Sequence, residues 1–314
     1  MKVTRGVVAV VLAAVVAVCS APGAGARPVY AGAAATATDP LIAAAGDIAC
    51  DPSSPKFLDG QGTSSACKQK ATSDLVLSQS VDAVLTLGDN QYQCGSAQQF
   101  QQAFDPSWGR FKSMIHPVPG DNEYESGAGC STSAAGYFTY FGAAAGDSRG
   151  DTAFTLGGWR LVGLNAECSH AGGCGSSSLQ AAFLRNQLGA ATCTLVYWHQ
   201  PFYNGTSRTG SSYQAFWDIL YAGNADVVLN GHLHNYTRFA PQDAGGHVDR
   251  ARGVREFIVG TGGRSLFSLN GTRNVEKTTK AYGVLELRLH PTSYTWAFVS
   301  MAGTTLDSGT ASCH

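Results

Sequence analysis

From residue 41 onward, short apolar runs alternate with polar segments that carry Gly-Asp, Pro-Gly or Asn-Gly. Short apolar runs that stop at turn-forming residues are typical of buried strands. We predict strands at 41–45, 83–87, 194–198 and 227–229, and helices at 73–80, 178–188 and 213–221. Because strands and helices alternate, the pattern predicts a sheet that contains parallel pairs and carries helices on its faces.

The last third of the chain has a different pattern. Strand-like segments at 257–259, 282–289 and 294–299 follow one another with little helix between them, which predicts a second sheet. After residue 40 there is no internal repeat, charge block or long linker. The sequence therefore predicts one domain over residues 41–314, preceded by a flexible lead at 27–40 that is rich in Ala, Thr and Gly.

The first 26 residues have the pattern of an export signal peptide. Lys2 and Arg5 precede an apolar run that ends at Cys19, and small residues follow as far as Ala26, after which we expect cleavage. A membrane anchor, the alternative, needs about 20 apolar residues, more than this run provides. A lipid on Cys19 is disfavoured by the bulky Val18 before it. We therefore expect a secreted protein with no stable membrane anchor.

Composition is consistent with a folded, exported protein. With 44% hydrophobic and 14% charged residues the chain can bury a sizeable core. Its net charge of -1 gives no electrostatic sign of a nucleic-acid-binding surface. Apart from Cys19 there are eight cysteines, an even number that could pair in an oxidising compartment, and no C-x-x-C motif indicates zinc binding. Cys50 with Cys67 and Cys168 with Cys174 are plausible local bridges.

Five short segments place Asp, Asn or His directly after an apolar run. They are Gly46-Asp47, Gly88-Asp89-Asn90-Gln91-Tyr92, Gly120-Asp121-Asn122-Glu123, Val196-Tyr197-Trp198-His199 and Gly231-His232-Leu233-His234. Ligands of α/β sheets bind at the carboxyl ends of strands, so these side chains could meet in one crevice. Each segment alone is also typical of an ordinary turn or a core histidine. The combination of carboxylates and imidazoles indicates a metal site.

In order and combination, these segments resemble the metallophosphoesterases of the calcineurin-like superfamily, and most of all the purple acid phosphatases. That family carries GDxG, GDxxY, GNH(D/E), VxxH and GHxH, and this chain has GDIA, GDNQY, GDNE, VYWH and GHLH. The resemblance covers residues 41–300. It implies a four-layer α/β/β/α sandwich, in which two mixed sheets pack together with helices outside and metals at one edge.

The resemblance also implies a pair of metal ions and their ligands. Asp89 would bridge both ions, Asp47, Tyr92 and His234 would complete the first site, and Asp121, His199 and His232 would complete the second. Metal coordination lowers the pKa of a bound water, which supplies a hydroxide to attack a phosphate ester near neutral pH. Tyrosinate at Tyr92 would indicate ferric iron, whereas an ordinary loop tyrosine is the alternative, so iron, zinc and manganese stay open.

The third motif departs from the family pattern. Aligning the glycines puts Asp121 at the position of a neutral asparagine ligand and Asn122 at the position of a histidine that faces the substrate. A shifted alignment makes Asn122 the ligand, but Asp121 is favoured because Glu123 then matches the family. Asn122 cannot donate a proton at neutral pH. His170, between Cys168 and Cys174, is our first candidate for the proton donor and Glu123 the second; an ordinary exposed loop histidine is the alternative for His170.

These observations predict a secreted phosphatase that acts on small phosphomonoesters. A phosphodiesterase for nucleotide or lipid head-group substrates is the first alternative, because the same dinuclear centre serves both reactions. A secreted binding protein that has lost catalysis is a second, favoured by the missing histidine, and a metal-dependent hydrolase of another bond is a third. The sequence gives no indication of the oligomeric state.

Overall fold

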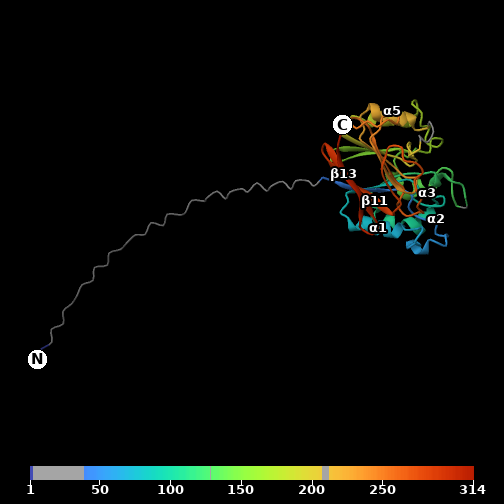
Figure 1. Ribbon diagram of the computed structural model, residues 1–314. Coiled ribbons are helices and arrows are strands. Elements are labelled where there is room, and N and C mark those ends of the chain that lie inside the picture. The colour runs from blue at the N-terminus through green and yellow to red at the C-terminus, as the bar shows by residue number, and fades with distance from the viewer. Residues whose placement is uncertain (3–38, 128, 207–211) are drawn as a thin grey trace. The chain divides into compact units, whose positions relative to one another are not determined.

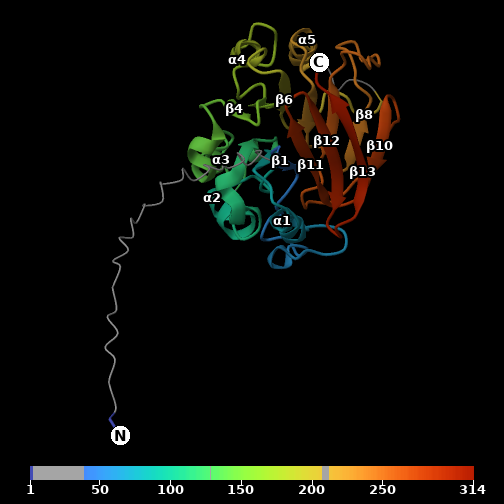
Figure 2. The same ribbon diagram turned by 90° about the vertical axis from the view of Figure 1, so that its left-hand side faces the viewer.

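Two β-sheets form the centre of the computed structural model, which describes residues 1–2, 39–127, 129–206 and 212–314 (Figures 1 and 2). The predicted signal peptide, apart from Met1 and Lys2, and the predicted lead, apart from Asp39 and Pro40, lie outside the described residues. Residues Asp39–His314 form one compact unit by their internal contacts. None of the helices in the described ranges is long and apolar enough to span a bilayer.

The first sheet has the strand order β13-β12-β11-β1-β2-β3. Its parallel strands are β1 (Leu41–Ala45), β2 (Ala83–Leu87) and β3 (Ile115–Val118). Its antiparallel strands are β11 (Gly283–His290), β12 (Ser293–Ser300) and β13 (Thr305–Ser312). Because β11 pairs with β1, the end of the chain extends the sheet that the beginning of the domain starts.

The second sheet has the order β10-β8-β9-β7-β6-β5-β4. Its parallel strands are β5 (Trp159–Gly163), β6 (Cys193–Tyr197), β7 (Val227–Asn230) and β9 (Arg255–Val259). Antiparallel strands complete it: β4 (Thr152–Leu156), β8 (Tyr236–Phe239) and β10 (Val275–Thr279). The prediction that the last third forms a sheet of its own is therefore wrong, since β9 lies in one sheet and β11 and β12 in the other.

The helices contribute to two separate hydrophobic cores. Buried residues of α1 (Gln69–Ser78), η2 (Phe100–Phe104), η3 (Trp108–Met114), η4 (Asn122–Tyr124), α3 (Ala135–Phe141) and η5 (Gly142–Ala145) belong to the large core that contains strands of both sheets. The short elements η1 (Leu58–Gly60) and α2 (Ala97–Gln99) lie in the connections after β1 and β2. Helices α4 (Leu179–Gln187) and α5 (Gln214–Ala222) contribute to a separate core with the second sheet. The predicted four-layer arrangement of two mixed sheets with helices is confirmed.

Strand β6 shows why a continuous apolar run is needed at the centre of this sandwich. All five of its residues are buried. Leu195 and Tyr197 belong to the large core shared with the first sheet, whereas Val196 belongs to the core shared with α4 and α5. A strand covered on both faces needs apolar side chains at successive positions rather than at alternate ones. The run that predicted a strand here thus also reflects its central place in the layers.

Four disulfides join the eight cysteines that lie in the described part of the chain. Cys50–Cys67 and Cys168–Cys174 confirm the two local bridges that the sequence predicted. Cys94–Cys130 is a third bridge. The fourth joins Cys193, at the start of β6, to Cys313 just after β13. This last bridge connects the two sheets covalently.

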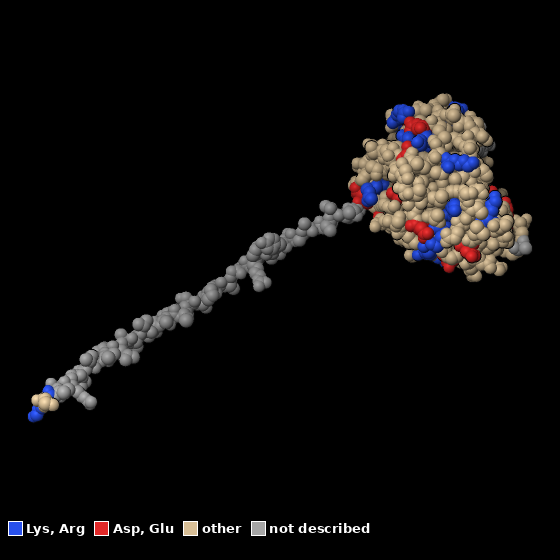
Figure 3. All heavy atoms as spheres, turned by 60° about the horizontal axis from the view of Figure 1, so that its bottom comes forward, with Lys and Arg blue, Asp and Glu red and all other residues tan. Residues whose placement is uncertain are grey.

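Charged side chains are sparse on the surface. On the face in Figure 3, blue and red groups are interspersed over a mostly uncharged surface. This distribution agrees with the low charged fraction and the net charge of -1. Long-range electrostatics therefore contribute little on this face, and recognition depends on local contacts.

Candidate metal centre

Polar side chains gather where strands of both sheets end. Asp47 follows β1, Asp89 follows β2 and Asp121 follows β3, so three neighbouring parallel strands each deliver one carboxylate to the same edge. His199 follows β6 and His232 follows β7, neighbouring parallel strands of the second sheet. The carboxyl ends of both parallel sets thus bring carboxylates and imidazoles together.

One group of contacts surrounds Asp47. Its Oδ1 lies 3.0 Å from Nε2 of His234 and accepts a hydrogen bond of 2.9 Å from the hydroxyl of Tyr92. The Tyr92 hydroxyl and Nε2 of His234 are 3.2 Å apart. The other oxygen of Asp47 accepts the backbone N–H of His232 at 2.8 Å. Three side chains expected in the first metal site therefore converge.

A second group of contacts surrounds Asp121. Its Oδ1 lies 3.0 Å from Nε2 of His199 and 3.1 Å from Nδ1 of His232. The same Nε2 of His199 lies 3.3 Å from Oδ1 of Asp89. One potential ligand atom each from Asp121, His199 and His232 lies within 4.8 Å of the others, and the same holds for Asp47, Asp89 and His199. Asp89 and His199 thus lie where the two groups adjoin.

The imidazoles are oriented from behind. Nδ1 of His199 lies 2.7 Å from the carbonyl oxygen of Leu87, and Nδ1 of His234 lies 2.7 Å from that of Ser265. Donation from Nδ1 to a carbonyl leaves Nε2 as the ligand atom, the usual arrangement behind a metal-bound histidine. Nε2 of His199 is buried and, among the described residues, has no hydrogen-bond partner of good geometry. That orphaned atom between two carboxylates fits a metal ion.

The backbone is strained at three of these positions. Asp47, Asp89 and His232 have φ values of 58°, 48° and 65°, in the left-handed region that non-glycine residues seldom adopt. Strain of this kind costs about 1–3 kcal/mol at each position and persists where the surroundings impose it. At Gly120, a Cβ atom would overlap the Asp89 carboxylate. The glycine that precedes Asp121 in its motif therefore leaves room for another ligand.

Electrostatics keep the carboxylates of Asp47 and Asp121 ionised. Burial by itself would raise the pKa of Asp47, but the positive charges of His234, His199 and His232 outweigh it and lower that pKa. Burial opposes the shift at Asp121 as well, and the neighbouring imidazoles of His199 and His232 lower its pKa. The positive charge of the imidazolium groups thus compensates the negative charge of these carboxylates. A bound cation can take over this role, with the imidazoles as neutral ligands.

Asp121 and Asn122 of the third motif make different contacts. Asp121 points its carboxylate at two histidines, as described above. Asn122 instead donates its backbone N–H to Oδ1 of Asp89 at 3.0 Å and its Nδ2 to Oδ2 at 2.7 Å. The side-chain oxygen of Asn122 accepts a hydrogen bond of 2.9 Å from Gln93. Of the two alignments that the sequence left open, this geometry favours Asp121 as the ligand. Asn122 instead orients the Asp89 carboxylate through two hydrogen bonds.

Glu123 lies beneath the centre and is completely buried. Its two oxygens accept the backbone N–H groups of Gln91 at 3.0 Å and Gly120 at 2.7 Å. Burial, with the charge of Asp89, raises the pKa of Glu123 to about 8. The side chain ties the loop after β2 to the loop after β3. The structure therefore does not place this carboxyl where a leaving group could reach it, which argues against the predicted role as proton donor.

His170 is exposed, and its ring stacks on Tyr124 with the ring centres 4.4 Å apart. The hydroxyl of Tyr124 accepts a hydrogen bond of 2.7 Å from Asn165. The loop that carries His170 is closed by the Cys168–Cys174 disulfide. No contact of His170 with the ligand cluster is present among the described residues. The stacking nevertheless gives the ring a defined position.

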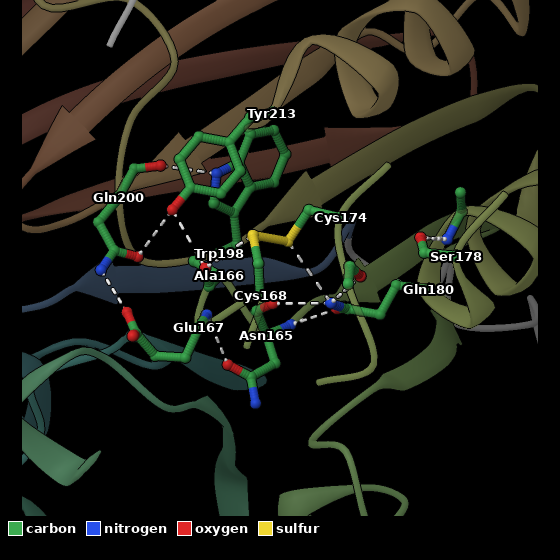
Figure 4. The surroundings of a disulfide bond; sticks show 12 residues. Asn165, Ala166, Glu167, Cys168, Cys174, Ser178, Gln180, Trp198, Gln200 and Tyr213 are labelled. Carbon is green, nitrogen blue, oxygen red and sulfur yellow. Dashed lines mark hydrogen bonds between the residues drawn. A yellow bond between two sulfur atoms is a disulfide. The ribbon is translucent and has the colours of Figure 1, made fainter. Parts of the chain in front are cut away.

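Glu167, which directly precedes the disulfide-closed loop, is connected to the cluster through Gln200. Nε2 of Gln200 donates to a carboxylate oxygen of Glu167, as Figure 4 shows. It also donates to Oδ1 of Asp121 at 3.3 Å. The hydroxyl of Tyr213 donates to the carbonyl of Ala166 at 3.1 Å and lies 3.4 Å from the side-chain oxygen of Gln200. Sequence reasoning missed Gln200 and Glu167. The position of Gln200 directly after His199 was the available signal.

Comparisons with known proteins identify the family of the chain and structures of the same fold. The family model described as calcineurin-like phosphoesterase matches residues 42–236. The fold resembles purple acid phosphatase PPD1 from seeds of yellow lupin (Lupinus luteus), at 15% identity and a TM-score of 0.69 over 87% of this chain and 53% of that one. This chain thus spans about half the length of that phosphatase.

Two further structures share the fold. One is GAP50, the anchor in the inner membrane complex of Plasmodium, at 14% identity and a TM-score of 0.57 over 88% of this chain and 90% of that one. The other is PhoD, at 13% identity and a TM-score of 0.52 over 88% of this chain and 68% of that one. No protein with a curated description matches the chain in sequence.

Proposed function

Since the chain belongs to the family of calcineurin-like phosphoesterases and is therefore a metal-dependent hydrolase of phosphoric esters, we propose that it cleaves phosphomonoesters at a pair of metal ions. The convergence of the two contact groups on Asp89 and His199 carries this proposal. Asp47, Tyr92 and His234 would hold the first ion, Asp121, His199 and His232 would hold the second, and Asp89 would be shared by both. A bridging carboxylate offsets the repulsion between two cations that lie close together.

When bound at these residues, metal ions would supply the nucleophile and charge stabilisation, because they lower the pKa of a coordinated water and polarise phosphoryl oxygens. The protein supplies access and position. The side chains of Asp121 and His232 are 37% and 40% exposed, whereas those of Asp47 and His199 are fully buried. Substrate therefore approaches from the side of Asp121 and His232. Asn122 keeps the bridging carboxylate in place with two hydrogen bonds.

Protonation of the leaving group is assigned to His170. The amide of Asn122 does not release a proton at neutral pH, and Glu123 is buried where it accepts two backbone N–H groups, so neither serves as the proton donor. His170 lies on a loop whose neighbouring residue Glu167 contacts Gln200 beside Asp121. His170→Ala should slow esters of poor leaving groups much more than esters of good ones. Equal losses on both classes would remove His170 from the mechanism.

Monoester preference is tested by comparing two substrates with the same leaving group. The oxidised protein, loaded with iron, zinc or manganese, is assayed with 4-nitrophenyl phosphate and with bis(4-nitrophenyl) phosphate. We expect the larger kcat/KM for the monoester, because the second ester group of a diester must also be accommodated in the centre. The reverse order would support a phosphodiesterase instead.

The seven ligands separate this proposal from that of a binding protein without catalysis. The missing motif histidine, replaced by Asn122, favours a binding protein without catalysis. GAP50 shows that an anchor protein can share the fold. Asp121→Asn provides the test, since it changes an anionic ligand to a neutral one of the same size. A catalyst should respond with a changed kcat or pH profile. A binding protein would show no turnover in either form.

Secretion completes the proposal. Four disulfides in a chain of this size indicate an oxidising compartment, because the cytosol keeps thiols reduced. The export pattern of the first 26 residues agrees with this location. A small soluble phosphate ester outside the cell is then the expected substrate. Analysis of the mature N-terminus from culture medium tests the location, and intact Met1 in a cell-associated protein would contradict it.

A further inference from the structure

A pocket of about 460 Å³ opens beside His234, one of the proposed ligands of the first metal. Apolar side chains line part of it and carboxamides line another part. Its lining includes Asn204, Leu233, His234, Phe267, Leu269 and Asn270. The volume falls within the range of pockets that hold small organic ligands. The pocket therefore adjoins the proposed reaction centre and is large enough for the organic part of an ester.

Phe267 gives this pocket its chemical character. Its ring stacks on the imidazole of His234, with ring centres 4.6 Å apart and an angle of 12° between the planes. Its backbone N–H donates to the carbonyl of His234 at 2.8 Å, which fixes the position of the residue. Yet Phe267 is 54% exposed, and it is the one aromatic among the strongly exposed large hydrophobic side chains of the described residues. One face of the ring is thus packed, and much of the rest is open.

An exposed aromatic ring is unfavourable in free energy because its apolar surface faces water, and a polar residue in this loop would avoid that cost. Aromatic rings bind other planar rings by stacking, at distances and angles like those already seen between Phe267 and His234. Leu233 and Leu269 add apolar surface to the same pocket, and the carboxamide of Asn270 adds a polar group. Together these features suit a flat, unsaturated ring that carries polar edges.

We propose that this pocket is a leaving-group subsite, in which a planar ring of the substrate stacks on Phe267 while its phosphate lies at the metal centre. The inference rests on the proposed phosphoesterase function and names the class of ester that the site prefers. Benzylic and other arylalkyl esters and nucleoside monophosphates share the required ring. Sugar phosphates and glycerol phosphates lack it and gain nothing from Phe267.

The test compares esters that differ in the ring alone. Benzyl phosphate and cyclohexylmethyl phosphate are primary alkyl esters of similar size, and only the first has a flat ring. A nucleoside 5′-monophosphate and ribose 5-phosphate form a second pair, with and without a base. We expect the ratio of kcat/KM within at least one pair to favour the planar ring tenfold or more. The pair with the larger ratio identifies whether an aryl group or a nucleobase is the natural occupant.

Variants at position 267 separate stacking from support of the metal ligand. Phe267→Tyr should keep the ratio, whereas Phe267→Leu and Phe267→Ala should reduce it at least fivefold. Loss of His234 packing would slow both members of a pair equally and leave the ratio unchanged. An unchanged ratio in Phe267→Ala would therefore overturn the subsite. Leu179→Ala, which removes another exposed apolar side chain, is the control and should leave the ratio as in the wild type.

Failure of the proposed function has a different signature. If the metal-loaded wild type turns over none of the four monoesters, phosphomonoester hydrolysis is wrong. The pocket is then tested with adenosine as a probe, by calorimetric titration of the wild type and of Phe267→Ala. Binding that the substitution weakens at least fivefold would support a ring subsite without phosphatase activity. Equal binding or no binding to the two proteins would overturn it.

Discussion

Glu256 on β9 allows a sharp test of the packing behind the candidate centre. The side chain is fully buried, and its Oε1 accepts the backbone N–H groups of Phe202 at 3.2 Å and Tyr203 at 3.4 Å. It thereby holds the segment that follows His199 and Gln200. Burial raises its pKa from 4.5 to about 8, partly offset by these two hydrogen bonds. Glu256 is therefore protonated in the folded protein at neutral pH.

The sign of the effect follows from proton binding. Between pH 4.5 and about 8 the folded protein keeps a proton on Glu256 that the unfolded chain has released, so the free energy of unfolding falls as pH rises. At about 1.4 kcal/mol per pH unit, this window amounts to about 5 kcal/mol. Stability from this group is fully present below pH 4.5 and is lost above pH 8. Glu256→Gln replaces the neutral carboxyl by a neutral amide of the same shape and removes the dependence.

Denaturant unfolding of the oxidised wild type and of Glu256→Gln, from pH 5 to pH 9, measures this difference. The two proteins should be about equally stable at pH 5, and the variant should be the more stable one at pH 9 by several kcal/mol. Glu125→Gln, at an exposed position, is the control and should follow the wild type. A constant difference between wild type and Glu256→Gln across the range would refute the reasoning.

Two further changes test the candidate metal centre and the Cys193–Cys313 disulfide between the sheets. Gly120→Ala would push a methyl group into the Asp89 carboxylate, so we expect a loss of metal content and at least a hundredfold loss of turnover. Gly175→Ala, with open space around it, is the control and should change neither quantity. Metal analysis and kcat of the two variants measure these effects. Replacing Cys193 and Cys313 by serine opens a loop with a sequence separation of 120, which should lower the free energy of unfolding by about 5 kcal/mol on chain-entropy grounds. An unchanged denaturation midpoint would show that this bridge adds nothing.

Much of the fold was predictable because its signals are local. Strands β1 and β2 begin and end as predicted, β6 is shifted by one residue at both ends, and β7 is one residue longer than predicted. Such agreement follows because apolar runs and turn residues lie next to each other in sequence. Sheet membership of the last third was not predictable in this way. The alternation in β11 indicates a strand, but its pairing with β1 depends on a partner about 240 residues away.

Helix α1 shows a related limit. It begins at Gln69, four residues before the predicted start, because its first turn contains polar residues that looked like a loop. Thr72 is buried there, where its hydroxyl lies 2.5 Å from the carbonyl oxygen of Gly262 and accepts from Nε1 of Trp108 at 3.1 Å. Polar residues that are satisfied by distant partners leave no pattern in the local sequence.

In the candidate site, too, residues with a local sequence signal were predictable and residues that depend on distant partners were not. Asp47, Asp89 and His199 each follow a strand, so their convergence could be expected from strand order and the family motifs. The burial of Glu123 could not, since it depends on the backbone of two separate loops. Phe267 carried no motif either, and only its stacking on a proposed ligand distinguishes it from an ordinary loop residue.

Metal stoichiometry tests the central claim most directly. The oxidised chain, purified in the presence of iron, zinc or manganese, is analysed for bound metal as wild type and as Asp89→Ala. Our account predicts two ions per chain in the wild type and loss of at least one, together with phosphatase turnover, when the shared carboxylate is removed. A wild type that binds no metal, or an Asp89→Ala protein that keeps both ions and its turnover, would contradict it.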